Sequence, residues 1–179
     1  MNRLDLRIFT ELPAEEPLYA ILDGARDRSI ADWIQRSRAP AWCLYSGALP
    51  PVLAEAAPWL LRLGRGHAFT TEFFEQGWGW EWGIALASTK PVKELRRHLR
   101  RFLRAQTEDG LRMAFRYYDP RVLRVYLPTL NAQELTTFFG PISALAVPEK
   151  ERNAFRVFRQ QDGVLAEVRA VHSPLGDQA

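Results

Sequence analysis

The 179-residue chain has few residues of the types that build disulfides and metal sites, with one cysteine and three histidines. The single cysteine, Cys43, excludes an intramolecular disulfide and is typical of a protein in a reducing compartment. His67, His98 and His172 are far apart in the sequence, and the patterns H-E-x-x-H and C-x-x-C are absent. We therefore expect no metal site and no cofactor, and we expect each histidine to have a structural role.

Long apolar runs are also absent, since no segment approaches the roughly 18 apolar residues that a membrane-spanning helix requires. Residues 1–16, MNRLDLRIFTELPAEE, carry too many charges for a secretory signal. The hydrophobic fraction of 47% and the charged fraction of 25% are those of an ordinary globular domain. We therefore expect a single domain that resides in the cytoplasm.

A catalytic constellation is missing as well. Cys43 lies in an apolar segment, which favours a buried, unreactive thiol, and no serine lies in a G-x-S-x-G motif. The glycine-rich run Gly77–Gly83 follows a predicted helix and precedes a predicted strand, the reverse of the order in a dinucleotide-binding turn. The sequence therefore predicts a protein that is not an enzyme. One enzymatic alternative stays open, a small α/β enzyme with a site near Asp23, Arg116 and Asp119, because both aspartates follow predicted strands.

The positive charge is concentrated in one segment. Seven basic residues and one glutamate lie between Lys90 and Arg104, although the formal net charge of the whole chain is only +3. The apolar residues of this segment are Val92, Leu95, Leu99 and Phe102. Their spacing predicts a helix with Leu99 in the core and the basic residues on the exposed face. Such a stripe attracts an acidic protein or nucleic acid, so a nucleic-acid-binding domain that uses the helix 91–104 is a second alternative.

Helical and strand-like patterns alternate along the chain, which predicts an α/β domain in which helices flank a sheet. The predicted strands are Leu18–Leu22, Ala41–Tyr45, Trp59–Leu63, Trp82–Ala87, Leu111–Tyr117, Ile142–Val147, Phe155–Gln160 and Val164–Val168. The turn signals Asp109-Gly110 and Asp162-Gly163 indicate a mixed β-sheet and a C-terminal β-hairpin. We expect a lead-in (1–17), a main part (18–147) and a C-terminal hairpin and tail (148–179) packed on the same domain.

Signals at helix ends complete this prediction. Helix starts are predicted at Ser29-x-x-Asp32, Pro91, Asp119-Pro120 and Asn131-x-x-Glu134. Gly77 is predicted to stop a short helix over residues 70–76. Trp78, Trp80 and Trp82 alternate with a period of two, so in an extended segment they would share one face. We expect at least two of these indoles in the core, although an exposed aromatic platform is the functional alternative.

Six blocks of the sequence, taken in order, resemble a known family. The blocks are LYAILDGARD (Leu18–Asp27), CLYSGALPPVLAEAAPWLLRL (Cys43–Leu63), GWGWEWGIAL (Gly77–Leu86), LRRHLRRFLRAQTEDG (Leu95–Gly110), FRYYDPRVLRVYLPTL (Phe115–Leu130) and FFGPI (Phe138–Ile142). Together they resemble the effector chaperones, or adaptor proteins, of type VI secretion, a domain of unknown function encoded beside the genes of the VgrG spike. The resemblance covers Leu18 to Val147.

The resemblance implies a protein-binding role without catalytic residues. Members of the family bind a toxic effector in the cytoplasm of the producing bacterium and help to couple it to the VgrG spike. We therefore expect an adaptor whose partners are a cognate effector and the C-terminal region of VgrG, with aromatic anchors and a basic surface. The candidate partner-binding residues are Trp78, Trp80, Arg97, Arg100, Arg104, Tyr117 and Tyr118.

Overall fold

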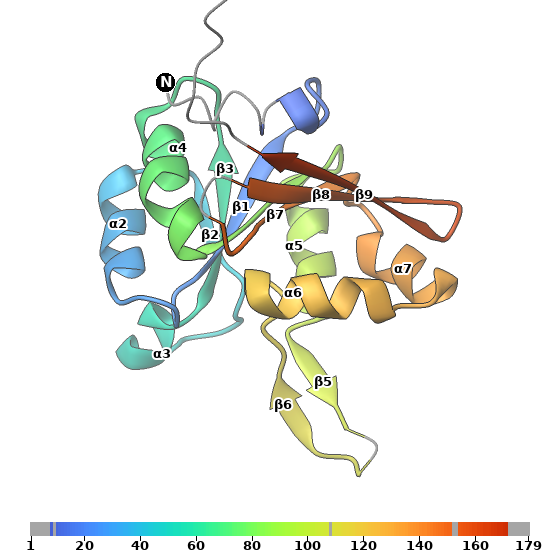
Figure 1. Ribbon diagram of the computed structural model, residues 1–179. Helices are drawn as coiled ribbons and strands as arrows, with labels where there is room; N and C mark the ends of the chain where they lie inside the picture. The colour runs from blue at the N-terminus through green and yellow to red at the C-terminus, as the bar shows by residue number, and fades with distance from the viewer. Residues whose placement is uncertain (1–7, 9, 108, 152–153, 172–179) are drawn as a thin grey trace, which may run out of the picture.

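The computed structural model describes residues 8, 10–107, 109–151 and 154–171, which form a layered α/β domain (Figure 1). Its main sheet has seven strands in the order β2-β3-β1-β4-β7-β8-β9. These strands are β1 (Leu18–Asp23), β2 (Ala41–Cys43), β3 (Pro58–Leu63), β4 (Gly83–Ala87), β7 (Ala144–Pro148), β8 (Ala154–Gln161) and β9 (Val164–Val171). The α-helices are α2 (Ser29–Ser37), α3 (Pro51–Glu55), α4 (Ala68–Glu72), α5 (Val92–Arg100), α6 (Pro120–Tyr126) and α7 (Ala132–Phe139).

The predicted fold class, a single α/β domain with flanking helices and a C-terminal β-hairpin, is confirmed. The pairing direction is more uniform than expected, because every strand pair between described residues is antiparallel. The C-terminal hairpin extends the main sheet, since β8 pairs with β7 and β9 forms the edge. None of the helices in the described part of the chain is long and apolar enough to cross a membrane.

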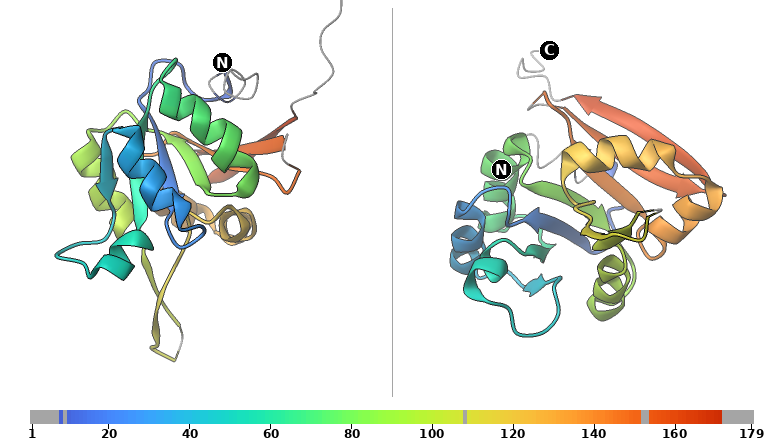
Figure 2. Two further views of the ribbon diagram at one scale, coloured as in Figure 1. Left: turned by 90° about the vertical axis from the view of Figure 1, so that its left-hand side faces the viewer. Right: turned by 90° about the horizontal axis from the view of Figure 1, so that it is seen from below.

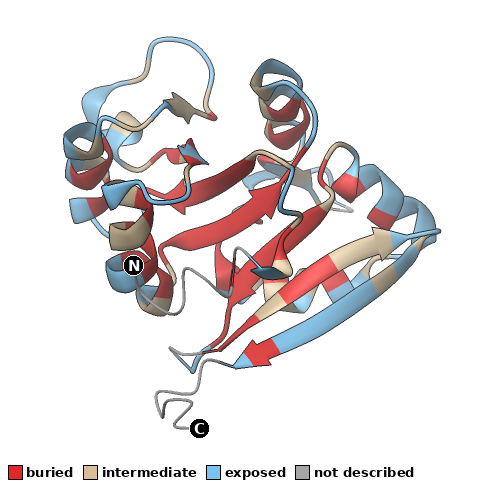
Figure 3. Cartoon of the chain, turned by 90° about the horizontal axis from the view of Figure 1, so that it is seen from above, coloured by how far each residue is buried: buried red, intermediate tan, exposed pale blue. Residues whose placement is uncertain are grey.

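Both faces of the inner strands of the sheet are buried, as β1 illustrates, whereas the edge strand β9 is largely exposed. Side chains alternate along a strand, so Leu18, Ala20 and Leu22 face one layer of helices, which includes α2. Tyr19 and Ile21 face the other layer, formed by α5, α6 and α7. Figures 1 and 2 show these layers on either side of the sheet, and Figure 3 shows the buried central strands between partly exposed helices. The fold therefore rests on two apolar clusters separated by one sheet.

The tryptophan-rich segment differs from its prediction. The helical segment that starts with α4 continues past its end as a π-helical turn (Phe73–Gly77) and a 3-10 turn (Trp78–Trp80). Gly77 does not stop it; a Cβ at this position would come within 2.6 Å of the Trp82 ring, so close packing explains the glycine. Glu81, in the left-handed conformation (φ 57°), ends the segment. The three indoles therefore do not share a strand face, although Trp78 and Trp82 are buried, as two of the three were expected to be.

The basic helix is shorter than predicted. α5 begins after Pro91, which is the N-cap and not the first helical residue, and it ends at Arg100 instead of Arg104. The chain then forms the two-stranded sheet of β5 (Arg104–Gln106) and β6 (Arg112–Ala114). The Asp109-Gly110 turn signal correctly indicates a hairpin, but the strand predicted over Leu111–Tyr117 is shortened to β6, and the hairpin forms a sheet of its own that projects from the body of the domain (Figures 1 and 2).

Capping signals locate two of three helix starts correctly. At α7, Asn131 Oδ1 accepts from the Glu134 backbone N–H at 3.0 Å, and Glu134 Oε2 accepts from the Asn131 N–H at 2.8 Å. At α6, Asp119 Oδ1 accepts from the backbone N–H two residues further on, at 3.0 Å. At α2 the predicted box is wrong, because the carboxylate of Asp27 accepts from the Ser29 N–H at 2.8 Å. Ser29 is therefore the first helical residue and not the cap.

Candidate partner-binding groove

Three of the predicted partner-binding aromatics lie inside the protein. Trp78 is fully buried, and its indole packs edge-on against Phe74 with ring centroids 5.2 Å apart. Tyr117 and Tyr118 are buried against the opposite face of the sheet, where burial raises the pKa of both hydroxyls above the usual range. The Tyr117 hydroxyl donates to the Leu99 carbonyl at 3.1 Å. The prediction that Trp78, Tyr117 and Tyr118 contact a partner is therefore wrong, since core packing occupies all three.

Arg100 also has a structural position. Its guanidinium folds back onto the end of β2, where Nε donates to the Leu44 carbonyl at 2.8 Å. Its Nη2 donates to the carbonyls of Cys43 and Tyr45, each at 3.1 Å, and Arg96 adds a hydrogen bond to the Cys43 carbonyl at 3.3 Å. Arg100 is partly exposed and lines the groove described below, so its contact with a partner stays a prediction, although its guanidinium already donates to three backbone carbonyls. These hydrogen bonds fix the loop after the edge strand to the last turn of α5.

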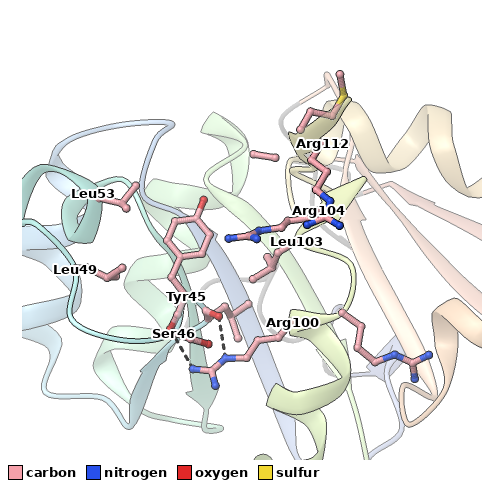
Figure 4. A pocket seen from close by; sticks show the side chains of 12 residues that line it. Tyr45, Ser46, Leu49, Leu53, Arg100, Leu103, Arg104 and Arg112 are labelled. Atoms are coloured by element: carbon pink, nitrogen blue, oxygen red, sulfur yellow. Dashed lines mark hydrogen bonds between the residues drawn. The ribbon is translucent and has the colours of Figure 1, made fainter. Parts of the chain in front are cut away.

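An open groove of about 590 Å³ lies between the segment that follows β2 and the end of α5 with β6 (Figure 4). Its aliphatic lining consists of Leu44, Leu49, Leu53, Leu103 and Met113, and its arginines are Arg100, Arg101, Arg104 and Arg112. Figure 4 shows Leu49 and Leu53 across the groove from Arg104 and Arg112, with Tyr45 between the two sides. The groove thus combines an apolar wall with a basic one.

The basic wall carries charge that the described residues do not neutralise. Arg101, Arg104 and Arg112 are exposed, and within the described ranges none of them lies within ion-pair distance of a carboxylate. Arg97, predicted as a partner contact, is exposed on α5 but does not line the groove. Charges beside an apolar wall interact more strongly with an incoming group than charges in open water. The groove can therefore bind an acidic segment that also carries apolar side chains.

Two of the residues predicted from the sequence, Arg100 and Arg104, line this groove, but its apolar wall was not predicted. Leu49 and Leu53 come from the proline-rich segment before β3, whereas Met113 comes from the projecting hairpin. The sequence does contain one signal for this wall: its apolar residues lie in short elements, where too few neighbouring side chains are available to bury them. Leu53 and Met113 are accordingly 44% and 46% exposed.

The residues of the enzymatic alternative do come together, at the end of β1. Asp23 is 1% exposed and accepts hydrogen bonds from Arg116, with Nε at 3.0 Å. The same guanidinium lies 3.6 Å from Asp119, which also accepts from Arg121 Nη2 at 2.6 Å. Burial raises the pKa of Asp23 against the opposing effect of Arg116. At Asp119 burial acts in the same direction, but the hydrogen bonds from Arg121 outweigh it and lower the pKa. Both carboxylates are thus engaged in a chain of ion pairs.

A second set of ion pairs continues this cluster. Glu81 lies 2.7 Å from Arg124 Nη2 and 3.7 Å from Arg26 Nη2. Arg124 also donates to the Pro148 carbonyl, and Arg26 Nε donates to the Trp80 carbonyl at 3.3 Å. Trp80, 56% exposed, is the predicted aromatic anchor that does lie on the surface. Arg124 therefore ties α6 to the end of β7 by a hydrogen bond, and to the turn that carries Trp80 by its ion pair with Glu81.

Among the described residues, His67, His98 and Cys43 do not assemble into a metal site. In the part of the chain that the structure describes, no three His, Cys, Asp or Glu side chains lie where they could hold a metal ion. His98 is buried with Nε2 2.8 Å from the Phe138 carbonyl, and burial lowers its pKa, so it has the structural role predicted for it. Burial raises the pKa of the half-buried Cys43 thiol. His172 lies outside the described residues.

A comparison with protein families matches residues 18–137, more than half of the chain, to a family described as Domain of unknown function (DUF4123). The groove residues, which run from Leu44 to Ala114, all lie within the matched region. The comparison with curated proteins gives no match, and neither does the comparison with solved structures.

Proposed function

The chain belongs to the DUF4123 family, and from this membership and the groove we propose that the protein is an adaptor, or chaperone, of bacterial type VI secretion. It binds a toxic effector in the cytoplasm and helps to load it onto the C-terminal region of the VgrG spike. The observation that carries this proposal is the groove, an open apolar surface within the family-matched region beside arginines that no carboxylate of the described residues pairs with. The resemblance of the six sequence blocks to effector chaperones supplies the biological setting.

The chemistry of the groove suits a carrier protein. Protein interfaces gain most of their affinity from a few apolar anchors that become buried inside a polar rim. Leu53 and Met113 are partly exposed in the free protein, so a partner can bury them. Arg104 and its basic neighbours increase the rate of association with an acidic partner. A groove with few anchors also permits release, which a carrier that loads its cargo elsewhere requires.

The two alternatives have less support. Arg96 and Arg100 donate to backbone carbonyls at the end of β2, which shortens the basic stripe that nucleic acid would contact. Asp23 and Asp119 are both held by arginines in the ion-pair cluster. A general acid or base needs access to a substrate, whereas Asp23 is buried beneath Arg116.

The direct test is co-expression with the effector that is encoded beside this protein. We expect the two proteins to elute together from a sizing column at micromolar concentration, and we expect a higher soluble yield of the effector. A fragment with the C-terminal region of VgrG should join this complex or compete with it. If the two proteins elute separately and the soluble yield of the effector is unchanged, the proposal is wrong for that effector. Strongly salt-dependent binding to an oligonucleotide, without any protein partner, would support the nucleic-acid alternative.

A further inference from the structure

We propose that the segment of the partner that fills the groove is an acidic amphipathic α-helix, with apolar side chains along one face and carboxylates beside them. This inference rests on the proposed function and adds the chemistry by which the effector is recognised. Three features of the groove carry it: the arginines that have no ion-pair partner among the described residues, the exposed apolar wall, and the occupied carbonyls at the end of β2.

The arginines determine the charge of the segment. Arg101 and Arg104 follow the end of α5, whereas Arg112 comes from β6, so positive charge reaches the groove from two elements. Each guanidinium can donate two parallel hydrogen bonds to one carboxylate, which is the strong form of this contact. A basic segment would instead place like charges together, at a cost in affinity. The complementary partner is therefore acidic.

The aliphatic wall favours a protein segment over nucleic acid. Nucleic acid in a basic groove gains affinity from aromatic side chains on which its bases stack. Among the described residues that line the groove, Tyr45 is the sole aromatic one, and the remaining apolar surface belongs to leucines, Met113 and Ala114. Burying Leu53 and Met113 requires apolar side chains from the partner. Methionine adapts its shape to such side chains, as in other surfaces that accept helices.

The edge of β2 favours a helix over an added strand. An extended peptide binds a sheet edge through the free backbone groups of that edge. At the end of β2, the carbonyls of Cys43, Leu44 and Tyr45 already accept hydrogen bonds from Arg100. Cys43 is the last residue of β2 and Leu44 and Tyr45 follow it, so the backbone that faces the groove at this point is already engaged. This favours recognition through side chains, as when a helix lies in a groove and presents residues at i, i+3, i+4 and i+7. A volume of about 590 Å³ accommodates several such side chains.

The first experiment uses a defined probe. A fluorescent peptide of about 18 residues, long enough to form a helix in isolation, carries leucines at i, i+3, i+4 and i+7 and glutamates on the flanking positions. Three control peptides accompany it: one of the same composition with the stripe scrambled, one with a central proline that prevents the helix, and one with lysine in place of glutamate. Fluorescence anisotropy with the full-length protein measures the dissociation constants. We expect the first peptide to bind at least tenfold more tightly than each control.

Matched variants locate the site. Leu53→Asp and the double variant Arg104→Glu, Arg112→Glu should weaken binding of the probe at least tenfold. The controls are Arg97→Glu, an exposed arginine of α5 outside the groove, and Val125→Asp, an exposed apolar residue of α6. Both controls should bind within about twofold of the unchanged protein, because neither residue lines the groove. Circular dichroism confirms that each variant is folded. Equal losses in the groove variants and the controls would overturn the assignment.

The same variants, applied to the complex with the co-encoded effector, separate this inference from the proposed function. If the complex forms and only the groove variants weaken it, both stand. If the complex forms and the groove variants bind normally, the adaptor function stands and the groove assignment is overturned. If no complex forms, the proposed function fails for that effector and the peptide data decide the groove alone. If the proline peptide binds as tightly as the first peptide, the inference that the segment is helical is overturned. If an oligonucleotide binds more tightly than the first peptide and the groove variants abolish its binding, the ligand of the groove is nucleic acid and not a protein segment.

Discussion

Arg100 and Leu44 are joined by a hydrogen bond of 2.8 Å from the guanidinium Nε to the backbone carbonyl, which ties the last turn of α5 to the end of the edge strand β2. The same guanidinium serves the carbonyls of Cys43 and Tyr45. One side chain therefore satisfies three outward-facing acceptors at the edge of the sheet. A residue that belongs to a charged stripe in the sequence is a structural link in the fold.

The first prediction compares Arg100 with Arg97 on the same helix. Arg100→Ala should lower the free energy of unfolding by about 2 kcal/mol, because hydrogen bonds from charged groups are worth about 1.5–3 kcal/mol each and water replaces part of the loss. Arg97→Ala should change it by about 0.5 kcal/mol or less, since Arg97 is exposed. Urea denaturation followed by circular dichroism measures both values. Equal effects of the two substitutions would contradict the structural role of Arg100.

The second prediction concerns the apolar face of α5. Leu99 is buried against the sheet, so Leu99→Ala should lower the free energy of unfolding by about 2–5 kcal/mol. Val125→Ala, on the exposed side of α6, is the control and should change it by about 0.5 kcal/mol or less. Thermal and urea denaturation of the purified variants measures both values. If Leu99→Ala leaves the free energy of unfolding unchanged, Leu99 does not lie on the buried face of α5.

The third prediction tests the ion-pair cluster by a double-mutant cycle. Arg116→Ala leaves the buried Asp23 carboxylate without its main partner and should cost roughly 2 kcal/mol, less than the 3–5 kcal/mol of a fully buried pair because Arg116 is partly exposed. Asp23→Asn in the Arg116→Ala background should recover part of this loss, since the charge that lacks a partner is then gone. Strictly additive effects of the two substitutions would contradict the pairing.

The fourth prediction is a pH dependence that His98 introduces. Burial, with a further contribution from Arg101, lowers the folded-state pKa of His98 below its ordinary value of 6.5. Below pH 6.5 the unfolded state therefore binds a proton at His98 that the folded state does not bind until the pH is lower. The contribution of neutral His98 to the free energy of unfolding is fully present above pH 6.5, and it is lost as the pH falls from there toward the folded-state pKa. His98→Gln keeps a donor for the Phe138 carbonyl but does not titrate. Urea midpoints between about pH 7.5 and pH 5 should fall less steeply in this variant; identical slopes would contradict the prediction.

Local signals in the sequence account for most of the fold. A continuous apolar run between Pro17 and Asp23-Gly24 locates β1, and the Asn131–Glu134 pair locates the start of α7, because each signal acts between residues close in the chain. Local signals do not predict the tryptophan-rich segment, because tryptophans at every second position are compatible with a tight helical turn as well as with a strand. Packing between Gly77 and Trp82 decides the outcome, and the sequence pattern does not contain that contact.

The groove could not be predicted in the same way. Its two walls come from the segment around Leu49 and Leu53 and from the hairpin that carries Arg112 and Met113, which no local pattern relates. The charge stripe pointed to the correct helix but not to the separate roles of its members. Which arginine reaches the backbone of another strand depends on the distance between α5 and β2, and this distance is set by the core beneath them.

One wall of the groove belongs to the projecting hairpin, all of whose β6 residues are exposed. A two-stranded ribbon of this kind contributes little to the stability of the domain, whose core lies in the seven-stranded sheet and its helices. Substitutions in the ribbon should therefore change the shape and charge of one wall of the groove without changing whether the protein folds. If the proposed adaptor function holds, the length and side chains of the ribbon are the part of the chain in which cargo preference can be altered while the sheet stays constant.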